Sequence, residues 1–267
     1  MPVNTKIEWT QNTWNPVSGC TQISPGCDNC YAKGIAERMG SKAFPNGFDI
    51  TLRPHKLRDP LKWKQPSLVF VNSMSDLFHR DIPDEFLTRI WTTMLTADHH
   101  TYQVLTKRPH RMVHKLRSLG LKTAPHIWLG VSVENQAMAK SRIPALLETR
   151  AAVKWLSCEP LLGSLDLTSW IDDLQWVISG GESGSGRRPA EYSWFREIRD
   201  QCVNGGVAYF HKQGNSFRPG DDRDLDGRTW DEYPDVRSSP MCPTGIHTPV
   251  EAHPADAMRA AGQEPML

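Results

Sequence analysis

The chain has 267 residues, of which 39% are hydrophobic and 23% are charged, and its formal net charge is only +1. No apolar run approaches the ~20 residues that a membrane span needs, and the N-terminal MPVNTKIEWTQ lacks the apolar core of a secretory signal. This composition excludes a membrane protein, a disordered chain and a collagen-like fibre. Overall charge gives no argument for nucleic-acid binding, and we expect a cytoplasmic protein.

Three of the six cysteines lie close together near the N-terminus. Cys20, Cys27 and Cys30 have the spacing C-x6-C-x2-C, and residues 31–39 after them look helical. In a reducing compartment such a cluster more often binds metal or does redox chemistry than forms disulfides. A structural zinc takes four protein ligands, whereas three thiolates suit a four-iron cluster whose open iron can hold and reduce S-adenosylmethionine. The alternatives are a zinc knuckle completed by a distant ligand and three unconnected cysteines.

From residue 67 onward, short apolar runs alternate with segments of helical periodicity. The predicted strands are 67–74, 101–106, 126–133, 152–158, 174–180 and 207–212, and the predicted helices are 84–98, 109–120, 136–149 and 192–206. We expect one more strand near residues 6–9, and we expect Pro144 to kink or split its helix. This alternation predicts a parallel sheet, either doubly wound or an incomplete (β/α) barrel. The proline-rich residues 238–267 are expected to form a disordered tail.

Each predicted strand ends in polar residues or glycines. In parallel α/β folds the carboxyl ends of the strands line the active site, so these residues are candidates for a common site. The alternative is that loops are polar in any protein and that helices favour such residues at their starts. The candidates are Asn72, Lys107, Ser132, Glu134, Glu159, Gly180, Gly181, Glu182 and Lys212.

Two other segments could bind an anion. The glycine-rich turn at 180–186, followed by Arg187 and Arg188, exposes backbone N–H groups, although it lacks the G-x-G-x-x-G pattern. Residues 106–117 form the one dense basic stretch and could meet phosphate. The alternatives are a flexible loop in the first case and a solvated helix face in the second.

Seven motifs resemble a known family. They are, in chain order, IEWTQNTWNPVSGC, CDNCYA, VLTKRP, GVSVENQ, CEPLLG, GGESG and LDGRTWDEYP, and they run across residues 7–234. The chain resembles a bacterial and prophage family of unknown function, phage protein Gp-thirty-seven/Gp-sixty-eight. That family looks like a branch of the radical S-adenosylmethionine enzymes and is most similar to the spore photoproduct lyase group. The six-residue gap after Cys20, and Asn29 in place of an aromatic residue before Cys30, depart from the usual C-x3-C-x2-C motif.

The resemblance implies an α/β fold with a partial (β/α)6 barrel over residues 1–237, an irregular C-terminal extension, a [4Fe-4S] cluster and S-adenosylmethionine. Our first hypothesis is an enzyme that uses an electron donor to cleave S-adenosylmethionine reductively and abstracts hydrogen from a substrate, for which a nucleotide or nucleic acid is one class. Cys20, Cys27 and Cys30 would hold the cluster, and Lys107, Glu159 and Lys212 would face the substrate. The cofactor would be bound by Asn72, Ser132, Glu134, Gly180, Gly181 and Glu182.

The second hypothesis is a non-catalytic nucleic-acid-binding protein, stabilised by zinc or an iron–sulfur cluster and using the basic stretch 106–117. The polar strand ends favour the enzyme, and the near-zero net charge argues against the nucleic-acid-binding protein.

Overall fold

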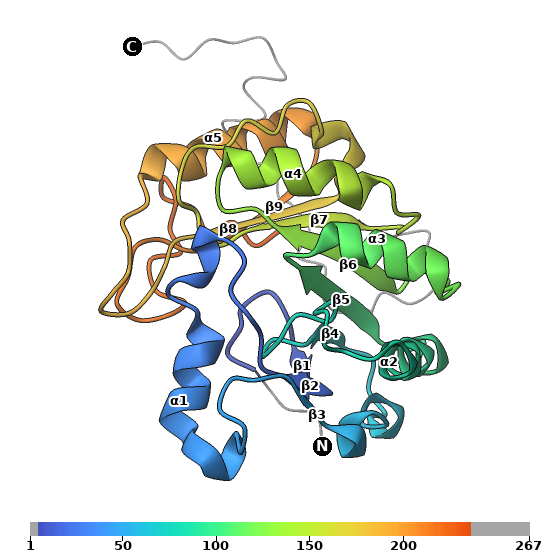
Figure 1. The fold of residues 1–267 in the computed structure, drawn as a ribbon. Helices are drawn as coiled ribbons and strands as arrows, with labels where there is room; N and C mark the ends of the chain where they lie inside the picture. Colours follow the sequence, from blue (N-terminus) through green and yellow to red (C-terminus); the bar gives the residue numbers. More distant parts are fainter. Residues whose placement is uncertain (1–4, 236–267) are drawn as a thin grey trace, which may run out of the picture.

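The computed structural model describes residues 5–235, so the tail predicted at 238–267 lies outside the described residues. A sheet in the order β1-β4-β5-β6-β7-β8-β9 forms the framework, and all its neighbouring strands are parallel. The strands curl into an open half-barrel, with α2 to α5 on its outer side and α1 apart from them (Figure 1). The predicted α/β partial barrel is confirmed.

Strands and helices alternate through most of the described chain, as right-handed parallel crossovers require. The strands are β1 (Asn12–Trp14), β2 (Val17–Ser18), β3 (Thr51–Leu52), β4 (Leu68–Val71), β5 (Thr101–Thr106), β6 (Ile127–Ser132), β7 (Lys154–Cys158), β8 (Trp176–Gly180) and β9 (Ala208–Gln213). The α-helices are α1 (Tyr31–Ala43), α2 (Asp84–Thr96), α3 (Pro109–Ser118), α4 (Gln136–Leu147) and α5 (Tyr192–Gly205). Strands β2 and β3 form a separate antiparallel pair.

Two details differ from the sequence-based expectations. The extra strand is not at residues 6–9 but is β1, which pairs with β4. Residues 8–9 form a turn instead, closed by a bond from the Thr10 N–H to the Ile7 carbonyl. Helix α4 runs unbroken through Pro144, which lies in its last turn. The missing proline N–H removes one hydrogen bond there and does not split the helix.

The two faces of the sheet carry separate apolar clusters. The larger one joins the outer face to α2–α5, and the smaller one lies on the inner face. Gly130 of β6 belongs to the inner face, where a Cβ would overlap the Trp155 indole, so only glycine leaves room for that ring. The inner cluster consists of Trp9, Leu68, Phe70, Trp128, Val153, Trp155, Trp176, Ile178 and Phe210. These large rings fill the half-barrel beneath the polar strand ends.

The edge of the sheet at β9 is covered by the segment that follows it. The His211 N–H donates to the Trp230 carbonyl at 2.8 Å, and the Glu232 N–H donates to the Tyr209 carbonyl at 3.1 Å. Phe210 and Asp231 form an antiparallel bridge between these bonds. The extension after β9 is irregular, as expected, but its residues 229–233 are integrated into the fold.

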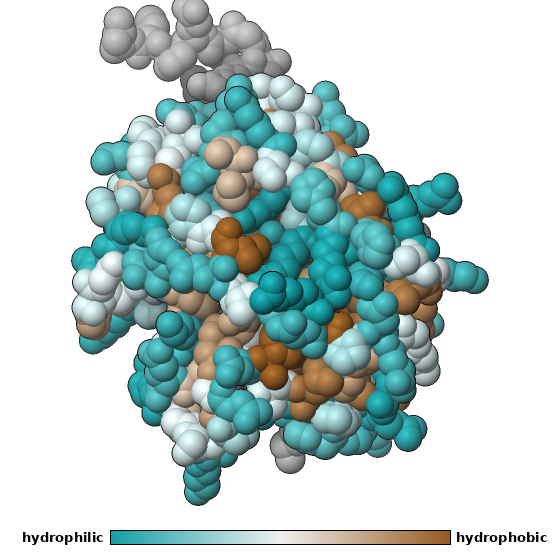
Figure 2. All heavy atoms as spheres, in the orientation of Figure 1, coloured by the Kyte–Doolittle hydropathy of each residue, from teal (hydrophilic) through white to brown (hydrophobic). Residues whose placement is uncertain are grey.

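The outer surface is mostly hydrophilic in the orientation of Figure 2, where apolar groups are scattered and do not form one continuous patch. Among residues 5–235, no helix combines the length and the apolar character needed to cross a membrane.

Candidate functional site

The three cysteines lie in the loop between β2 and α1, and all are partly exposed. Gly19 begins this loop with a φ of 89°, and a Cβ there would overlap the Asp49 backbone, so only glycine can make the turn. The Gly19 N–H donates to the Met74 carbonyl at 2.9 Å, just beyond β4. Cys30 occupies the N-cap position of α1. The loop is thus attached to the carboxyl edge of the sheet at its start and to a helix at its end.

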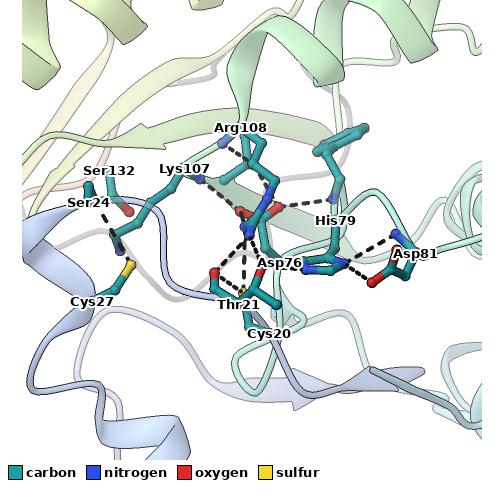
Figure 3. Close-up of polar contacts among 12 residues, drawn as sticks. Cys20, Thr21, Ser24, Cys27, Asp76, His79, Asp81, Lys107, Arg108 and Ser132 are labelled. Atoms are coloured by element: carbon teal, nitrogen blue, oxygen red, sulfur yellow. Dashed lines mark hydrogen bonds and ion pairs between the residues drawn. The ribbon is translucent and has the colours of Figure 1, made fainter. Parts of the chain in front are cut away.

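Arg108, just after β5, holds the first part of the loop (Figure 3). Its Nη1 donates to Cys20 Sγ at 3.5 Å and to Asp76 Oδ2 at 2.9 Å, while Nη2 donates to the Thr21 carbonyl at 2.8 Å. Burial and the charge of Asp76 raise the pKa of the Cys20 thiol, and Arg108 opposes that rise. A permanent cation therefore lies beside one of the three thiols.

His79 supports the same part of the loop (Figure 3). Its Nδ1 accepts from the Asp81 N–H at 3.2 Å, so the proton of the neutral ring lies on Nε2, which donates to Thr21 Oγ1 at 2.7 Å. Burial, aided by Arg108, lowers the pKa of His79 and keeps the ring neutral near pH 7. Thr21 is thus held by both His79 and Arg108.

Glu134, after β6, holds the middle of the loop. Its Oε1 accepts from the Gly26 N–H at 3.2 Å, and its Oε2 pairs with Arg142 of α4 at 2.8 Å. Arg142 also donates to the Ser132 carbonyl at 2.7 Å. The Glu134 side chain is fully buried, and a guanidinium and a backbone N–H satisfy its carboxylate there.

Glu182, after β8, holds the last part of the loop. Its Oε2 accepts from Asn29 Nδ2 at 2.8 Å, and its carboxylate also pairs with Arg188. Arg188 also forms an ion pair with Asp28 of the loop, at 3.0 Å. Its guanidinium therefore joins Glu182 after β8 to the cysteine loop. Burial opposes the charge of Glu182, but the bonds from Arg188 and Asn29 outweigh it and lower its pKa.

Two backbone donors of the glycine-rich turn at 180–186 are used within the protein. The Gly181 N–H donates to the Gln213 carbonyl at 3.1 Å, and the Gly184 N–H donates to the Phe217 carbonyl at 3.0 Å. Arg188 is engaged with two carboxylates, so its guanidinium fastens the cysteine loop, and anion binding by the turn stays a prediction.

Three predicted residues come together on the inner side of β7, β8 and β9. Lys212 Nζ lies 3.0 Å from Glu159 Oε1, and Ser157 Oγ donates to Glu159 Oε2 at 3.3 Å. A Cβ at Gly180 would lie 2.7 Å from Glu159 Oε1, so glycine makes room for this carboxylate. Burial opposes the charge of Lys212, but Glu159 outweighs it and raises the pKa of the lysine.

The remaining predicted residues are spread along the same edge. Asn72 is buried with a φ of 61°, and its Oδ1 accepts from the Val17 N–H at 3.4 Å, so it links β4 to β2. Ser132 is buried at the end of β6. Lys107 is half-buried, and its side chain points toward Cys27 in Figure 3. No ion pair or hydrogen bond of Lys107 Nζ occurs within residues 5–235.

The cysteine loop offers three thiols as possible metal ligands. Among the described residues, no three His, Cys, Asp or Glu side chains converge where one ion could bind them all. A zinc knuckle needs such convergence, whereas in a four-iron cluster each thiolate binds a different iron. The structure has three thiols in one partly exposed loop, with a guanidinium beside Cys20. Three thiolates are the donor set of a four-iron cluster with one open iron.

Two further features of the sequence are the remaining cysteines and the basic stretch at residues 106–117. Cys158 and Cys202 are fully buried, as expected of small apolar residues, and Cys242 lies outside the described residues. Within residues 106–117, three of the five lysine and arginine side chains form ion pairs. Arg108 pairs with Asp76, Lys115 with Asp84 and Arg117 with Glu148. Ion pairs therefore neutralise only part of this stretch, and phosphate binding there stays a prediction.

Sequence reasoning gave no role to the residues that support the loop from behind. These are Thr21, Asp76, His79, Arg108 and Arg142. Asp76 and Arg108 follow β4 and β5, which are neighbours in the sheet, and opposite charges at adjacent strand ends were the available signal.

Comparison with known proteins places the chain in a family. Residues 4–234 match the family described as protein of unknown function (DUF5131), and the chain belongs to it. No curated protein matches the chain. A solved structure, spore photoproduct lyase complexed with dinucleoside spore photoproduct, is similar with a TM-score of 0.46 and 10% sequence identity. The match covers 75% of this chain and 63% of that one, so this chain spans less than two thirds of its length.

Proposed function

We propose that the protein is a radical S-adenosylmethionine enzyme with a [4Fe-4S] cluster on Cys20, Cys27 and Cys30. The observation that carries the proposal is the anchoring of the three-cysteine loop at the carboxyl edge of a parallel half-barrel. Side chains from three strand ends hold it there, and they contact Cys20, Gly26 and Asn29. This edge is where parallel α/β folds bind their ligands.

The chemistry would be divided between the cofactors and the chain. When bound, the cluster supplies the electron that cleaves S-adenosylmethionine to a carbon radical, which removes a hydrogen atom from the substrate. Glu134 and Glu182, whose carboxylates are bonded to the loop, act as positioning residues. Asn72, Ser132, Gly180 and Gly181, which lie at the strand ends, are the remaining residues for cofactor contact.

Lys107, Glu159 and Lys212 are the groups that would face the substrate. The Glu159–Lys212 pair lies at the ends of β7 and β9. The Nζ of Lys107 forms no ion pair within residues 5–235. A cationic group of this kind suits an anionic substrate, which agrees with a nucleotide or nucleic acid as the class to test first. An external electron donor, a cytoplasmic location and membership of the phage and prophage proteins belong to the same proposal.

The test is anaerobic reconstitution of the full chain with iron and sulfide. We expect a brown protein that, with dithionite and S-adenosylmethionine, releases 5′-deoxyadenosine detectable by mass spectrometry. Cys27→Ala should stay colourless and produce none, while the matched control Cys202→Ala should behave as wild type. A colourless wild-type protein that binds one equivalent of zinc would overturn the proposal and support the non-catalytic alternative.

A further inference from the structure

The Arg108 guanidinium is confined between a thiol and a carboxylate. Its side chain is 13% exposed, and that of Asp76 is 8% exposed. Nη1 is shared between Cys20 Sγ and Asp76 Oδ2, and Nη2 is shared between the carbonyl and the hydroxyl of Thr21. Arginine does not lose its proton in proteins, so the positive charge beside Cys20 is permanent.

Asp76 keeps this guanidinium in place. Its Oδ1 accepts from Thr106 Oγ1 at 2.7 Å and from the Phe78 N–H at 3.0 Å, and its Oδ2 accepts from the Lys107 N–H at 3.0 Å. These bonds fix the carboxylate to the ends of both β4 and β5. Arg108 is therefore preorganised at the thiol before any cluster binds.

We propose that Arg108 is a positioning residue that raises the reduction potential of the cluster through Cys20, and that Asp76 partly offsets this effect. A cation and an N–H bond at a ligand sulfur stabilise the extra negative charge of the reduced cluster. The carboxylate of Asp76 acts in the opposite direction. This inference rests on the proposed function, because it presumes that Cys20 binds the cluster.

The experiment compares Arg108→Gln and Asp76→Asn in reconstituted full-length protein. Iron per chain and the midpoint potential from a redox titration followed by electron paramagnetic resonance are measured for each variant. Arg108→Gln should shift the potential to more negative values, and Asp76→Asn should shift it to more positive values. Arg117→Gln, which removes an exposed arginine of the same basic stretch, is the control and should leave the potential unchanged.

The opposite signs of the two potential shifts distinguish an electrostatic role of Arg108 and Asp76 from a merely structural one. Both substitutions break the same ion pair, so both lower the melting temperature, but only an electrostatic role moves the potential in opposite directions. Equal potentials, or shifts of the same sign, overturn the inference and leave the proposed function standing. A wild-type protein that takes up no iron overturns the proposed function itself.

A second pair of variants keeps the test decisive if Arg108→Gln fails to fold. Arg108→Lys retains the positive charge, so its midpoint potential should stay close to that of the wild type. The midpoint potential of Asp76→Asn should again be more positive than that of the wild type, and by more than the shift in Arg108→Lys. An Asp76→Asn protein with a wild-type or more negative potential contradicts the inference without any need for Arg108→Gln.

Discussion

The cysteines of this protein fall into two regions with opposite environments. Cys20, Cys27 and Cys30 are partly exposed in a loop at the open edge of the sheet, whereas Cys158 and Cys202 are fully buried in the layer between sheet and helices. Burial raises the pKa of both buried thiols, which keeps them protonated and unreactive. The same side chain is thus a candidate metal ligand or an apolar filler according to its place relative to the strand ends.

The largest expected effect is on iron binding. Cys20→Ala and Cys30→Ala should, like Cys27→Ala, lose bound iron down to background, because a site-differentiated cluster has no thiolate to spare. Cys158→Ala should keep wild-type iron and lose only stability, by about 1–2 kcal/mol from the small cavity left in the core. Iron analysis and urea unfolding measure the two effects. Wild-type iron in any of the loop variants would remove the distinction between the two regions.

Alkylation of the metal-free protein gives a second contrast. Under native, reducing conditions iodoacetamide should label Cys27 and Cys30 readily. It should label Cys158 and Cys202 at least about a hundredfold more slowly, because their reaction waits for local unfolding. Peptide mass spectrometry over a time course measures the rates. Comparable labelling of all four residues would show that the buried layer opens easily and that burial does not protect its thiols.

The buried layer should also control the response of stability to acid. Burial lowers the pKa of His100 and of His211 from the ordinary value of 6.5 to about 4. Below pH 6.5 the unfolded chain binds protons that the folded protein excludes, so stability falls as the pH decreases toward 4. The loss is up to about 1.4 kcal/mol per pH unit for each histidine.

Urea unfolding at a series of pH values measures this effect. His211→Gln should flatten the decline between pH 6.5 and 4, while the same change at the exposed His55 should leave it as in wild type. An identical decline in the His211→Gln protein would show that this buried ring does not contribute to it.

The smallest expected effect concerns the anchoring of the loop. Glu182→Gln removes the charge that Asn29 and Arg188 bind, and charge-assisted bonds contribute about 1.5–3 kcal/mol each. Since glutamine keeps one acceptor, we expect the cluster to lose iron to a chelator only several-fold faster, with Glu148→Gln as the exposed control. If iron release is unchanged but calorimetry shows weaker S-adenosylmethionine binding, Glu182 contacts the cofactor and does not anchor the loop.

The sequence predicted the parts of the fold in which local pattern and tertiary burial agree. The segment 101–106, with its β-branched and aromatic residues, is buried along most of its length and becomes β5 with the predicted bounds. The other five strands lie within three residues of their predicted ends. Strand β1 was not predicted, because it is a three-residue edge strand in which Asn12 and Thr13 interrupt any apolar run. Its existence depends on pairing with β4, which no local window contains.

The sequence predicted that the site lies at the strand ends, but it did not predict which hydrogen bonds and ion pairs connect the site residues. The spacing of Cys20, Cys27 and Cys30 indicated a metal centre. The contacts of Glu134 with Gly26 and of Glu182 with Asn29 join residues more than a hundred positions apart. Which side chain turns toward the loop depends on the curl of the sheet and on the path of the loop across it, and neither can be read from the residues.

The covered edge at β9 has a consequence for synthesis of the chain. Sheet edges are sites of intermolecular pairing, and here the protecting strand-like segment, residues 229–233, follows β9 in the sequence. The seven-stranded sheet can therefore assemble on the ribosome before its last edge is closed. During that interval the nascent protein exposes an unpaired β-edge, and pairing of residues 229–233 with β9 ends this exposure to aggregation.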